Sequence, residues 1–352
     1  MKNPLTIKDI ARLANVSQST VSKALNNRHD VSPKTKERIL EIVSQHNFIP
    51  DASGKALKNR YTNNIGVIFR KDDNPLRNPF FSRVLEGIEA EIAFNEYNLI
   101  LYLMPDHKKP GLPKMVQQRQ VDGIILVGTQ SPDFVDTLRE AGIPTVLIDP
   151  RAHIPSRPQV LIDNENGAFL ATRHLIEHGH RKIGFIAGEL SIPSFQQRLD
   201  GYKKALTYYG IPITKSLIKC GGYEEGYRFT RDLLQDAVNR PTAIFAAYDI
   251  NAIHGYRAIY EANLRIPDDI SFVGFDDIDL ARMASPPLTT IRVYKEELGS
   301  VAVRNLRSIL LGETPPSTTS IIPVKLVERD SVRSVEVQQE SAPARQASAK
   351  KI

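Results

Sequence analysis

Short apolar runs alternate with helical patterns from Asn64 onward, and this alternation limits the possible folds more than any other feature of the chain. The run "IGVIF" is a candidate for a buried strand, "FFSRVLEGIEAEIAFNE" has helical periodicity, and "NLILYLM" is the next strand candidate. Further strands are predicted at "VDGIILVG", "TVLID" and "QVLID", with a helical pattern, "DFVDTLREAG", between the first two. Strands that alternate with helices are typical of parallel sheets in a doubly wound α/β fold.

A second series of the same kind begins at "ENGAFLATRHLIEHG" and ends at "SFVGFDD", so the sequence predicts two similar lobes. In such sheets ligands bind at the carboxyl ends of the strands. The residues that end the predicted strands include Asp149, Asp163, Tyr248, Asp276 and Asp277. Their carboxylates could act as paired general acids or accept hydrogen bonds from the hydroxyls of a polar ligand, and the sequence offers no matched nucleophile for the first role.

The excess positive charge of the chain, +6 over 352 residues, lies in its first sixty residues. These contain eleven Lys and Arg but five Asp and Glu, whereas the rest of the chain holds 35 of each kind. A basic segment can be a solvated surface and nothing more, but it also fits a polyanionic partner.

Three short helical patterns occupy this basic segment. Thr6 and Asp9 form a potential capping box for the first helix, which breaks at "ANV", where Asn15 can adopt the left-handed conformation. Ser17 is the expected cap of the second helix and Ser32 that of the third. Three short helices with a tight turn between the first two match the helix-turn-helix arrangement.

The second helix has an apolar face and a polar face. On a helical wheel one arc is covered by Thr20, Val21, Ala24 and Leu25. The opposite arc contains no carboxylate and consists of Gln18, Ser19, Ser22, Lys23 and Asn26. Side chains of these types bond base edges and phosphates. Any small helical bundle has a polar outer face, but the absence of acids and the local positive charge favour DNA binding.

The segment "IPDASGKALKNRYTNN" follows the bundle and contains a helical stretch of about two turns. Isolated helices shorter than about 12–15 residues rarely persist, and Gly54 costs this one roughly another 1 kcal/mol relative to Ala. Such a linker would fold only with a partner, when Leu57 could wedge between base steps of the minor groove while Lys55 and Lys58 meet phosphates. The alternative is a plain flexible linker.

Composition and motifs exclude several functional classes. One cysteine, Cys220, excludes a disulfide framework and a cysteine-built metal site. The N-terminus lacks the apolar core of a signal peptide and no apolar run approaches the ~20 residues of a membrane span, so a cytoplasmic protein is expected. No GxGxxG, GxxxxGK[ST] or GxSxG motif supports nucleotide or hydrolase chemistry, and no cofactor is expected. His174, His178 and His180 have a possible metal spacing, but a helix C-terminus that favours cations explains them more simply, so no metal is expected.

Eight stretches of the chain, in the right order, resemble the lactose-repressor/galactose-repressor family of bacterial transcription regulators. They are "TIKDIARLANVSQSTVSKALN", "PDASGKAL", "NPFF", "VDGIIL", "ATRHLIEHGHRKIGFIAG", "RLDGY", "PTAIFAAYD" and "ISFVGFDDIDLARMASPPLTTIR". The resemblance spans residue 5 to about 330, and its motifs are independent of one another.

The resemblance implies an all-α helix-turn-helix headpiece (1–49), a hinge helix (50–61) and a two-lobed α/β core with parallel sheets, similar to periplasmic sugar-binding proteins. The chain would cross between the lobes three times, which assigns 62–161 plus 291–320 to lobe one and 162–290 plus 321–330 to lobe two. The polar remainder, 331–352, is predicted to be disordered. Members of the family bind palindromic operators as dimers, and a small molecule between the lobes changes their angle and so acts on the hinge helices.

The expected DNA contacts are Thr6, Ser17, Gln18, Ser19, Thr20, Ser22, Lys23, Asn26, Leu57 and Lys58. By the resemblance, Gln18 and Ser19 occupy the base-reading positions and Leu57 is the minor-groove wedge. Lys23 replaces the usual Arg, which exchanges a bidentate fork for a point charge. Gly54 replaces the usual Ala of the hinge helix.

The effector-contacting positions that the resemblance implies are Phe80, Asp149, Arg198, Tyr223, Tyr248 and Asp276. Arg198 and Asp276 suit the recognition of hydroxyls or anions through charge-assisted bonds, and Phe80 and Tyr223 could stack on a sugar face. Tyr248 stands where the family usually has Asn, so the ligand is expected to differ from the best-known ones.

The leading hypothesis is a ligand-responsive DNA-binding regulator, a repressor of carbohydrate-utilisation genes that binds palindromic double-stranded operator DNA as a homodimer. The alternative is a sugar-binding receptor without a DNA role, which the missing signal peptide and the basic headpiece argue against. An enzyme acting on a sugar is a third possibility, for which the sequence offers no nucleophile or cofactor motif.

Overall fold

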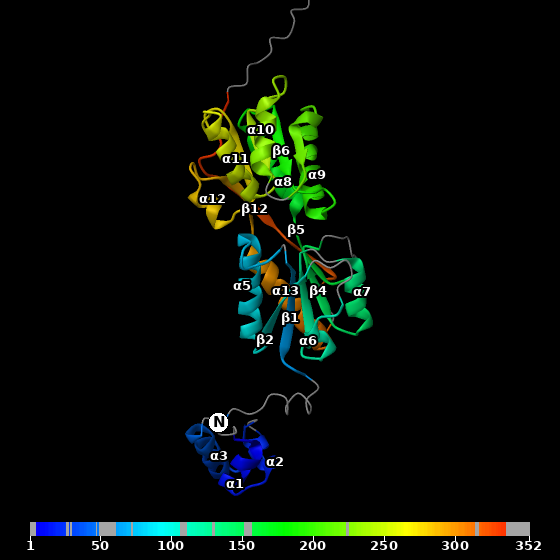
Figure 1. Cartoon of the computed structure of the whole chain (residues 1–352), viewed down its shortest axis with the longest axis vertical. Helices are drawn as coiled ribbons and strands as arrows, with labels where there is room; N and C mark the ends of the chain where they lie inside the picture. The colour runs from blue at the N-terminus through cyan, green and yellow to red at the C-terminus, as the bar shows by residue number, and fades with distance from the viewer. Residues whose placement is uncertain are drawn as a thin grey trace, which may run out of the picture. The chain divides into compact units, whose positions relative to one another are not determined.

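The computed structural model of the chain forms two compact units, Met1–Thr62 and Asn63–Ile352 (Figure 1). The residues that it describes are 5–25, 28, 30–46, 48, 61–71, 73–105, 111–128, 131–150, 157–222, 225–313 and 317–335. Residues 50–60 of the predicted hinge helix lie outside these residues.

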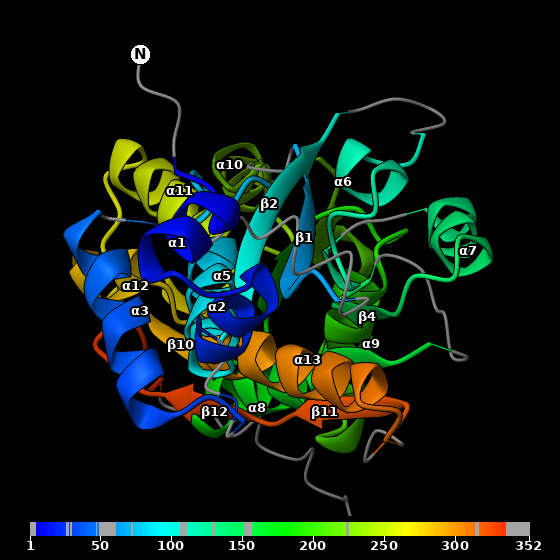
Figure 2. The ribbon, with the colours of Figure 1, turned by 90° about the horizontal axis from the view of Figure 1, so that it is seen from below.

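The N-terminal unit contains the three predicted helices, α1 (Ile7–Ala14), α2 (Gln18–Leu25) and α3 (Pro33–Gln45) (Figure 2). The capping box of α1 is confirmed, because the Thr6 side chain accepts the N–H of Asp9 and the Asp9 carboxylate accepts the N–H of Thr6. Asn15 has a φ of 52° and ends α1 in the left-handed conformation. The small core is formed by the buried side chains of Ile10, Ala11, Ala14, Val21, Ala24, Ile39 and Phe48.

The first lobe is a doubly wound sheet of parallel strands in the order β11-β5-β4-β3-β1-β2. Their bounds are Asn64–Arg70 (β1), Asn98–Met104 (β2), Gly123–Val127 (β3), Thr145–Ile148 (β4), Gln159–Ile162 (β5) and Thr319–Ile322 (β11). Side chains on one face pack on α5 (Pro79–Phe94) and α13 (Lys295–Leu310), and those on the other pack on α6 (Lys114–Gln117) and α7 (Pro132–Glu140). In β1, for example, Val67 faces the first pair of helices and Ile68 the second.

The second lobe has the strand order β12-β10-β9-β8-β6-β7, and only β12 runs antiparallel to its neighbour among the pairings that the structure describes. Its strands are Ile183–Ala187 (β6), Ile218–Cys220 (β7), Ala243–Ala246 (β8), Ser271–Asp276 (β9), Thr289–Val293 (β10) and Val324–Val327 (β12). Its helices are Asn164–Glu177 (α8), Pro193–Tyr208 (α9), Gly226–Gln235 (α10), Asp249–Glu261 (α11) and Asp279–Met283 (α12), with a short 3-10 turn at Lys215–Leu217. The predicted class, two α/β lobes with parallel sheets, is confirmed.

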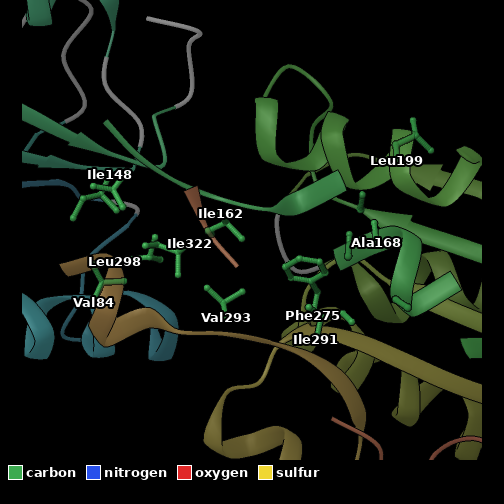
Figure 3. Packing of buried hydrophobic residues seen from close by; sticks show 14 of the residues in the cluster. Val84, Ile148, Ile162, Ala168, Leu199, Phe275, Ile291, Val293, Leu298 and Ile322 are labelled. Carbon is green, nitrogen blue, oxygen red and sulfur yellow. The ribbon is translucent and has the colours of Figure 1, made fainter. Parts of the chain in front are cut away.

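The chain passes between the lobes at three places, from β5 to α8, from β10 to α13 and from β11 to β12. Ile162, Val293 and Ile322 stand at these places and belong to one apolar cluster that continues from one lobe into the other (Figure 3). The boundaries expected at residues 291 and 321 are corrected by two or three residues. β10 continues to Val293, which pairs with Val324, and β11 continues to Ile322, which pairs with Ile162.

The prediction of a disordered tail from residue 331 is wrong for its first five residues. Ser331 is buried; its hydroxyl donates to Phe272 O (2.6 Å) and accepts the N–H of Thr289 (2.8 Å). The N–H of Val335 donates to His178 O (2.8 Å). These bonds hold the segment without apolar periodicity, which is why the sequence pattern missed it. Residues 336–352 lie outside the described part.

Candidate functional site

A cavity of about 90 Å³ lies where the carboxyl ends of the two sheets meet. Strand ends converge there because, among the described strands, those other than β12 run in the same direction within their sheet. The first lobe contributes Asp73, Asn78, Phe80, Phe81, Gly128 and Asp149. The second lobe contributes Ile192, Ser194, Phe195, Arg198, Tyr248 and Asp276. Five of the six residues expected to contact an effector therefore line one cavity, and the sixth, Tyr223, lies outside the described residues.

Arg198, on α9, is the cation of this cavity and is only 4% exposed. Its Nε donates to Asn164 Oδ1 (2.9 Å) and its Nη1 to the backbone carbonyl of Ala247 (2.5 Å). The guanidinium also lies over the ring of Phe275, with 3.8 Å between Cζ and the ring centroid. A planar cation with this many fixed partners is oriented before any ligand arrives.

Asp276 ends β9, and its Oδ1 lies 3.4 Å from Arg198 Nη1. This ion-pair contact is longer than a charge-assisted hydrogen bond, and the buried oxygen accepts no hydrogen bond from the described residues. Burial raises the pKa of Asp276 above its ordinary value, although the nearby Arg198 opposes the rise. The pKa of Asp249 is also raised, by burial first and then by the charge of Asp276. The cavity thus contains a buried carboxylate oxygen that can accept a hydrogen bond from a ligand.

Aromatic rings from both lobes form the apolar walls. Phe80 and Phe81 make an edge-to-face pair with centroids 5.2 Å apart, and the backbone N–H groups of both donate to Asn78 Oδ1, which caps α5. Across the cavity, Phe195 and Tyr248 pack with centroids 5.4 Å apart. A few fixed polar groups between aromatic walls are typical of small-molecule sites.

Two other strand-end carboxylates point elsewhere. Asp277 accepts from Arg292 Nε (2.6 Å) and Arg329 Nη2 (2.5 Å). Burial would raise the pKa of Asp277, but its bonds to the two arginines hold it below its usual value. Asp163 accepts from Asn166 Nδ2 (3.1 Å), at the start of α8. Neither residue lines the cavity.

Sequence reasoning missed Asp73, Asn78, Phe81, Ser194 and Phe195 as lining residues. Asp73 comes shortly after β1, so the rule that ligands bind at strand ends would have found it. Asn78 and Phe81 belong to the quoted motif "NPFF", of which Phe80 alone was assigned. Ser194 and Phe195 begin α9 and carry no signal in the sequence.

The polar face of α2 is exposed, as predicted. Gln18, Ser19 and Lys23 are exposed and Ser22 is partly so, while Val21 and Ala24 are buried on the opposite face. Lys23 Nζ lies 2.6 Å from the Asp30 carboxylate, and its hydrogen bond holds the pKa of Asp30 below the usual range. The sequence did not predict this ion pair.

The six other expected DNA contacts have local partners or lie outside the described part. Ser17 Oγ accepts the N–H of Thr20 and is hydrogen-bonded to its hydroxyl (2.8 Å), so the two side chains brace the start of α2. Thr6 is bonded to Asp9 in the capping box. Asn26, Leu57 and Lys58 lie outside the described residues.

Two of the three histidines contact the C-terminal segment, His178 through its backbone carbonyl and His180 through its ring. His180 is buried; its Nδ1 is hydrogen-bonded to Thr242 Oγ1 (2.9 Å) and its Nε2 to Arg333 O (3.1 Å). Burial lowers the pKa of His180 to about 4, so the ring is neutral at pH 7. In the part of the chain that the structure describes, no group of His, Cys, Asp and Glu has a geometry suited to a metal ion. Nor is any described helix both long and apolar enough to span a membrane.

Comparisons with known proteins agree with both units. Residues 6–51 match the family model "Bacterial regulatory proteins, lacI family", and residues 172–332 match "Periplasmic binding protein-like domain". The chain is 37% identical to the ribose operon repressor of Haemophilus influenzae over 334 residues (94% of this chain, 99% of that one). It is 34% identical to the HTH-type transcriptional repressor PurR of Photobacterium profundum over 336 residues (94% and 99%).

Solved structures agree as well. The lac repressor dimer bound to operator and the anti-inducer ONPF is similar over 94% of this chain and 100% of that one, with a TM-score of 0.81 and 27% identity. A LacI family transcriptional regulator from Enterococcus faecium with bound ribose is similar over 78% of this chain and 100% of that one, with a TM-score of 0.67 and 29% identity. By sequence along 94% of its length, and by fold, the chain belongs to the lacI family of bacterial regulatory proteins and is a DNA-binding transcription regulator.

Proposed function

We propose that the chain is a repressor whose affinity for operator DNA is set by a neutral monosaccharide bound between the lobes. The single observation that carries the proposal is the buried Oδ1 of Asp276, which accepts no hydrogen bond from the described residues and lies beside a fixed guanidinium. A sugar hydroxyl would donate to this oxygen and accept from its surroundings.

The charges of the cavity favour a neutral ligand over an acidic one. Its lining contains three carboxylates, those of Asp73, Asp149 and Asp276, and one guanidinium, that of Arg198. Arg198 already donates to Asn164 and Ala247 and is paired with the Asp276 carboxylate, so little of its charge is left for a phosphate or a sugar acid. Ionised carboxylates only accept hydrogen bonds, so they suit a ligand rich in donors.

The names of the relatives narrow the candidates to two classes. The ribose operon repressor suggests a pentose, and the PurR repressor suggests a purine. A purine would stack well on the aromatic walls, but it offers fewer donors to a buried acceptor such as Asp276 Oδ1 than a pentose does. The aromatic walls also suit the apolar face of a sugar ring.

On the DNA side, we propose that the exposed face of α2 enters the major groove, with Gln18 and Ser19 reading bases. Ser17, Thr20, Ser22, Lys23 and Asn26 would contact phosphates or brace the helix, with Thr6, Leu57 and Lys58 completing the contacts. A homodimer would present two such helices to a palindromic operator. Its place of action would be the cytoplasm, where the operator is.

Isothermal titration calorimetry with D-ribose, D-ribose 5-phosphate and adenine tests the ligand class. We expect D-ribose to bind, and the phosphate and adenine to bind more weakly by at least about tenfold. Tighter binding of adenine or of the phosphate would contradict the proposal. We also expect D-ribose to be recovered unchanged after long incubation, since the site is proposed to bind its ligand without turnover.

A further inference from the structure

The structure contains a buried ammonium group at the second passage between the lobes. Lys295 is the first residue of α13 and is 5% exposed. Its Nζ donates to the backbone carbonyls of Asp276 (2.5 Å), Asp277 (3.1 Å) and Val293 (3.2 Å). An ammonium has three donors, so these three carbonyls use all of them.

The main chain of Lys295 is fixed to the first lobe. α13 packs against α5 so closely that a Cβ on Gly87 would lie 2.0 Å from Glu296 O, and one on Gly299 would lie 2.4 Å from Val84 O. Two glycines therefore bring the backbones of the two helices into direct contact at the start of α13. Interiors packed this closely transmit strain, so a shift at the start of α13 would be passed to α5.

The ammonium of Lys295, in contrast, is fixed to the second lobe. The two carbonyls beyond the passage belong to Asp276 and Asp277, whose φ angles of 112° and 53° are in the region that favours glycine. Such a turn persists only where its surroundings hold it. Lys295 holds it from the first lobe, and Asp249 holds it from within the second by accepting the N–H of Ile278 (2.9 Å).

The location of this cation is unfavourable by local rules. A positive charge at the N-terminus of a helix opposes the helix dipole, and a buried ammonium loses its hydration. Glu296 and Glu297 in the first turn offset part of the first cost. A residue that breaks a local rule where a ligand site meets a domain passage is more readily explained by function than by stability.

We propose that Lys295 is a positioning residue that couples the ligand cleft to the angle between the lobes. Its ammonium is hydrogen-bonded to the turn at Asp276 and Asp277, which orients the Asp276 carboxylate toward the cavity. Its backbone belongs to α13, which packs in the first lobe. A ligand that hydrogen-bonds the Asp276 carboxylate would therefore shift α13. Conversely, a change in the angle between the lobes would change the orientation of the Asp276 carboxylate in the cavity. The inference rests on the proposed function, because it assigns the regulation of that same site.

The decisive variant is Lys295→Met, which keeps the length of the side chain but removes its charge and donors. Its matched control is Lys325→Met, an exposed lysine on β12. Titration with D-ribose gives the ligand affinity, and operator binding with and without D-ribose gives the coupling factor. We expect Lys295→Met to bind D-ribose within about tenfold of the unaltered chain but to lose at least about tenfold in coupling. A coupling factor equal to that of Lys325→Met would overturn the inference.

A second measurement needs no ligand. Hydrogen–deuterium exchange in the turn 276–278 should speed up by at least about tenfold in Lys295→Met and stay unchanged in Lys325→Met. Unchanged exchange in both would overturn the inference. If the unaltered chain binds no D-ribose, the proposed function fails by itself, and the exchange result still decides the role of Lys295.

Lys295→Gln provides a test that can still be carried out if the methionine variant folds poorly. Its amide can donate to two of the three carbonyls, so coupling should be partly restored relative to Lys295→Met. A residue that merely stabilised the fold would lower ligand affinity and coupling together. A parallel loss of both in Lys295→Gln, at full folding by circular dichroism, would therefore contradict the proposal.

Discussion

The cleft and the outer face of α2 use similar polar side chains in opposite settings. In the cleft, Arg198 and Asp276 are buried, and bonds to Asn164 and Ala247 orient the guanidinium. On α2, Gln18 and Ser19 are exposed on a short helix. The cleft groups are thus oriented by the fold, whereas we expect those of α2 to become ordered only on DNA. We expect single residues to carry large energies in the cleft and small, salt-dependent ones on α2.

The largest expected effect is that of Arg198→Ala. Truncating one partner of a buried charged contact in a binding site costs about 2–5 kcal/mol in binding, which corresponds to a loss of at least roughly 30-fold in ligand affinity. Calorimetry with D-ribose measures it. Operator binding without ligand should change far less, because Arg198 is expected to act only in the cleft.

Arg282→Ala is the matched control for this variant. Arg282 lies on α12 and is paired with Asp279 at the surface, so its loss should leave ligand affinity unchanged. If the two alanine variants lost ligand affinity to the same degree, the claim that buried cleft residues contribute more binding energy than exposed ones would be wrong.

The second prediction concerns pH. Asp276 accepts a ligand hydroxyl best as a carboxylate. Its pKa is raised by burial and by the charge of Asp149, although Arg198 and Lys295 oppose the rise. The group takes up a proton as the pH falls through this raised pKa, so ligand affinity should fall about tenfold per pH unit below it. The fall should begin at a higher pH than an exposed carboxylate would give.

Asp276→Asn separates this titration from general acid unfolding. The amide has no charge to lose, so the variant should bind more weakly at pH 7 and show a flat profile as the pH falls. A profile in the unaltered chain that stays flat down to pH 4.5, measured by calorimetry on folded protein, would exclude Asp276 as the titrating acceptor.

The third prediction moves to α2. Gln18→Ala should cost about 1–3 kcal/mol at one operator base pair and relax the preference there. Ligand affinity should remain as it was, since Gln18 belongs to the other unit of the chain. Binding assays on operators varied at each position test this, and an equal loss at every position would show a phosphate contact in place of base reading.

Sequence patterns predicted the elements whose signals are local. The apolar run of β1 and the caps Thr6, Ser17 and Ser32 needed only a few neighbouring residues to be recognised. The boundaries of the lobes were harder, because β10 and β11 end where partners more than thirty residues away stop pairing. No local pattern contains that information.

The residues of the candidate site likewise divide into those that local sequence patterns predicted and those that depend on distant partners. The strand-end rule correctly located Asp149 and Asp276, but it gave the same weight to Asp277, whose carboxylate bonds Arg329, 52 residues away. Phe195 reached the cavity from a helix start with no motif of its own. Sequence spacing fixes the edge of the sheet on which a side chain lies, whereas long-range partners fix its direction.

The smallest expected effect lies at Lys23, and it tests the weak side of the comparison. Its ion pair with Asp30 is exposed on both sides, 47% and 56%, and is therefore easily exchanged for a phosphate. Asp30→Asn removes a competing charge and should raise operator affinity about threefold at low salt. In a Lys23→Met background the same change should have less effect, because there is no ammonium to release.

Gel-shift titrations at several salt concentrations give the operator affinities of the unaltered chain, the two single variants and the double variant. Lys23→Met alone should lower the salt slope of operator binding by about 0.9. If Asp30→Asn instead weakened binding, the ion pair would be a part of the DNA-reading surface, and α2 would resemble the cleft in depending on side chains held by the fold.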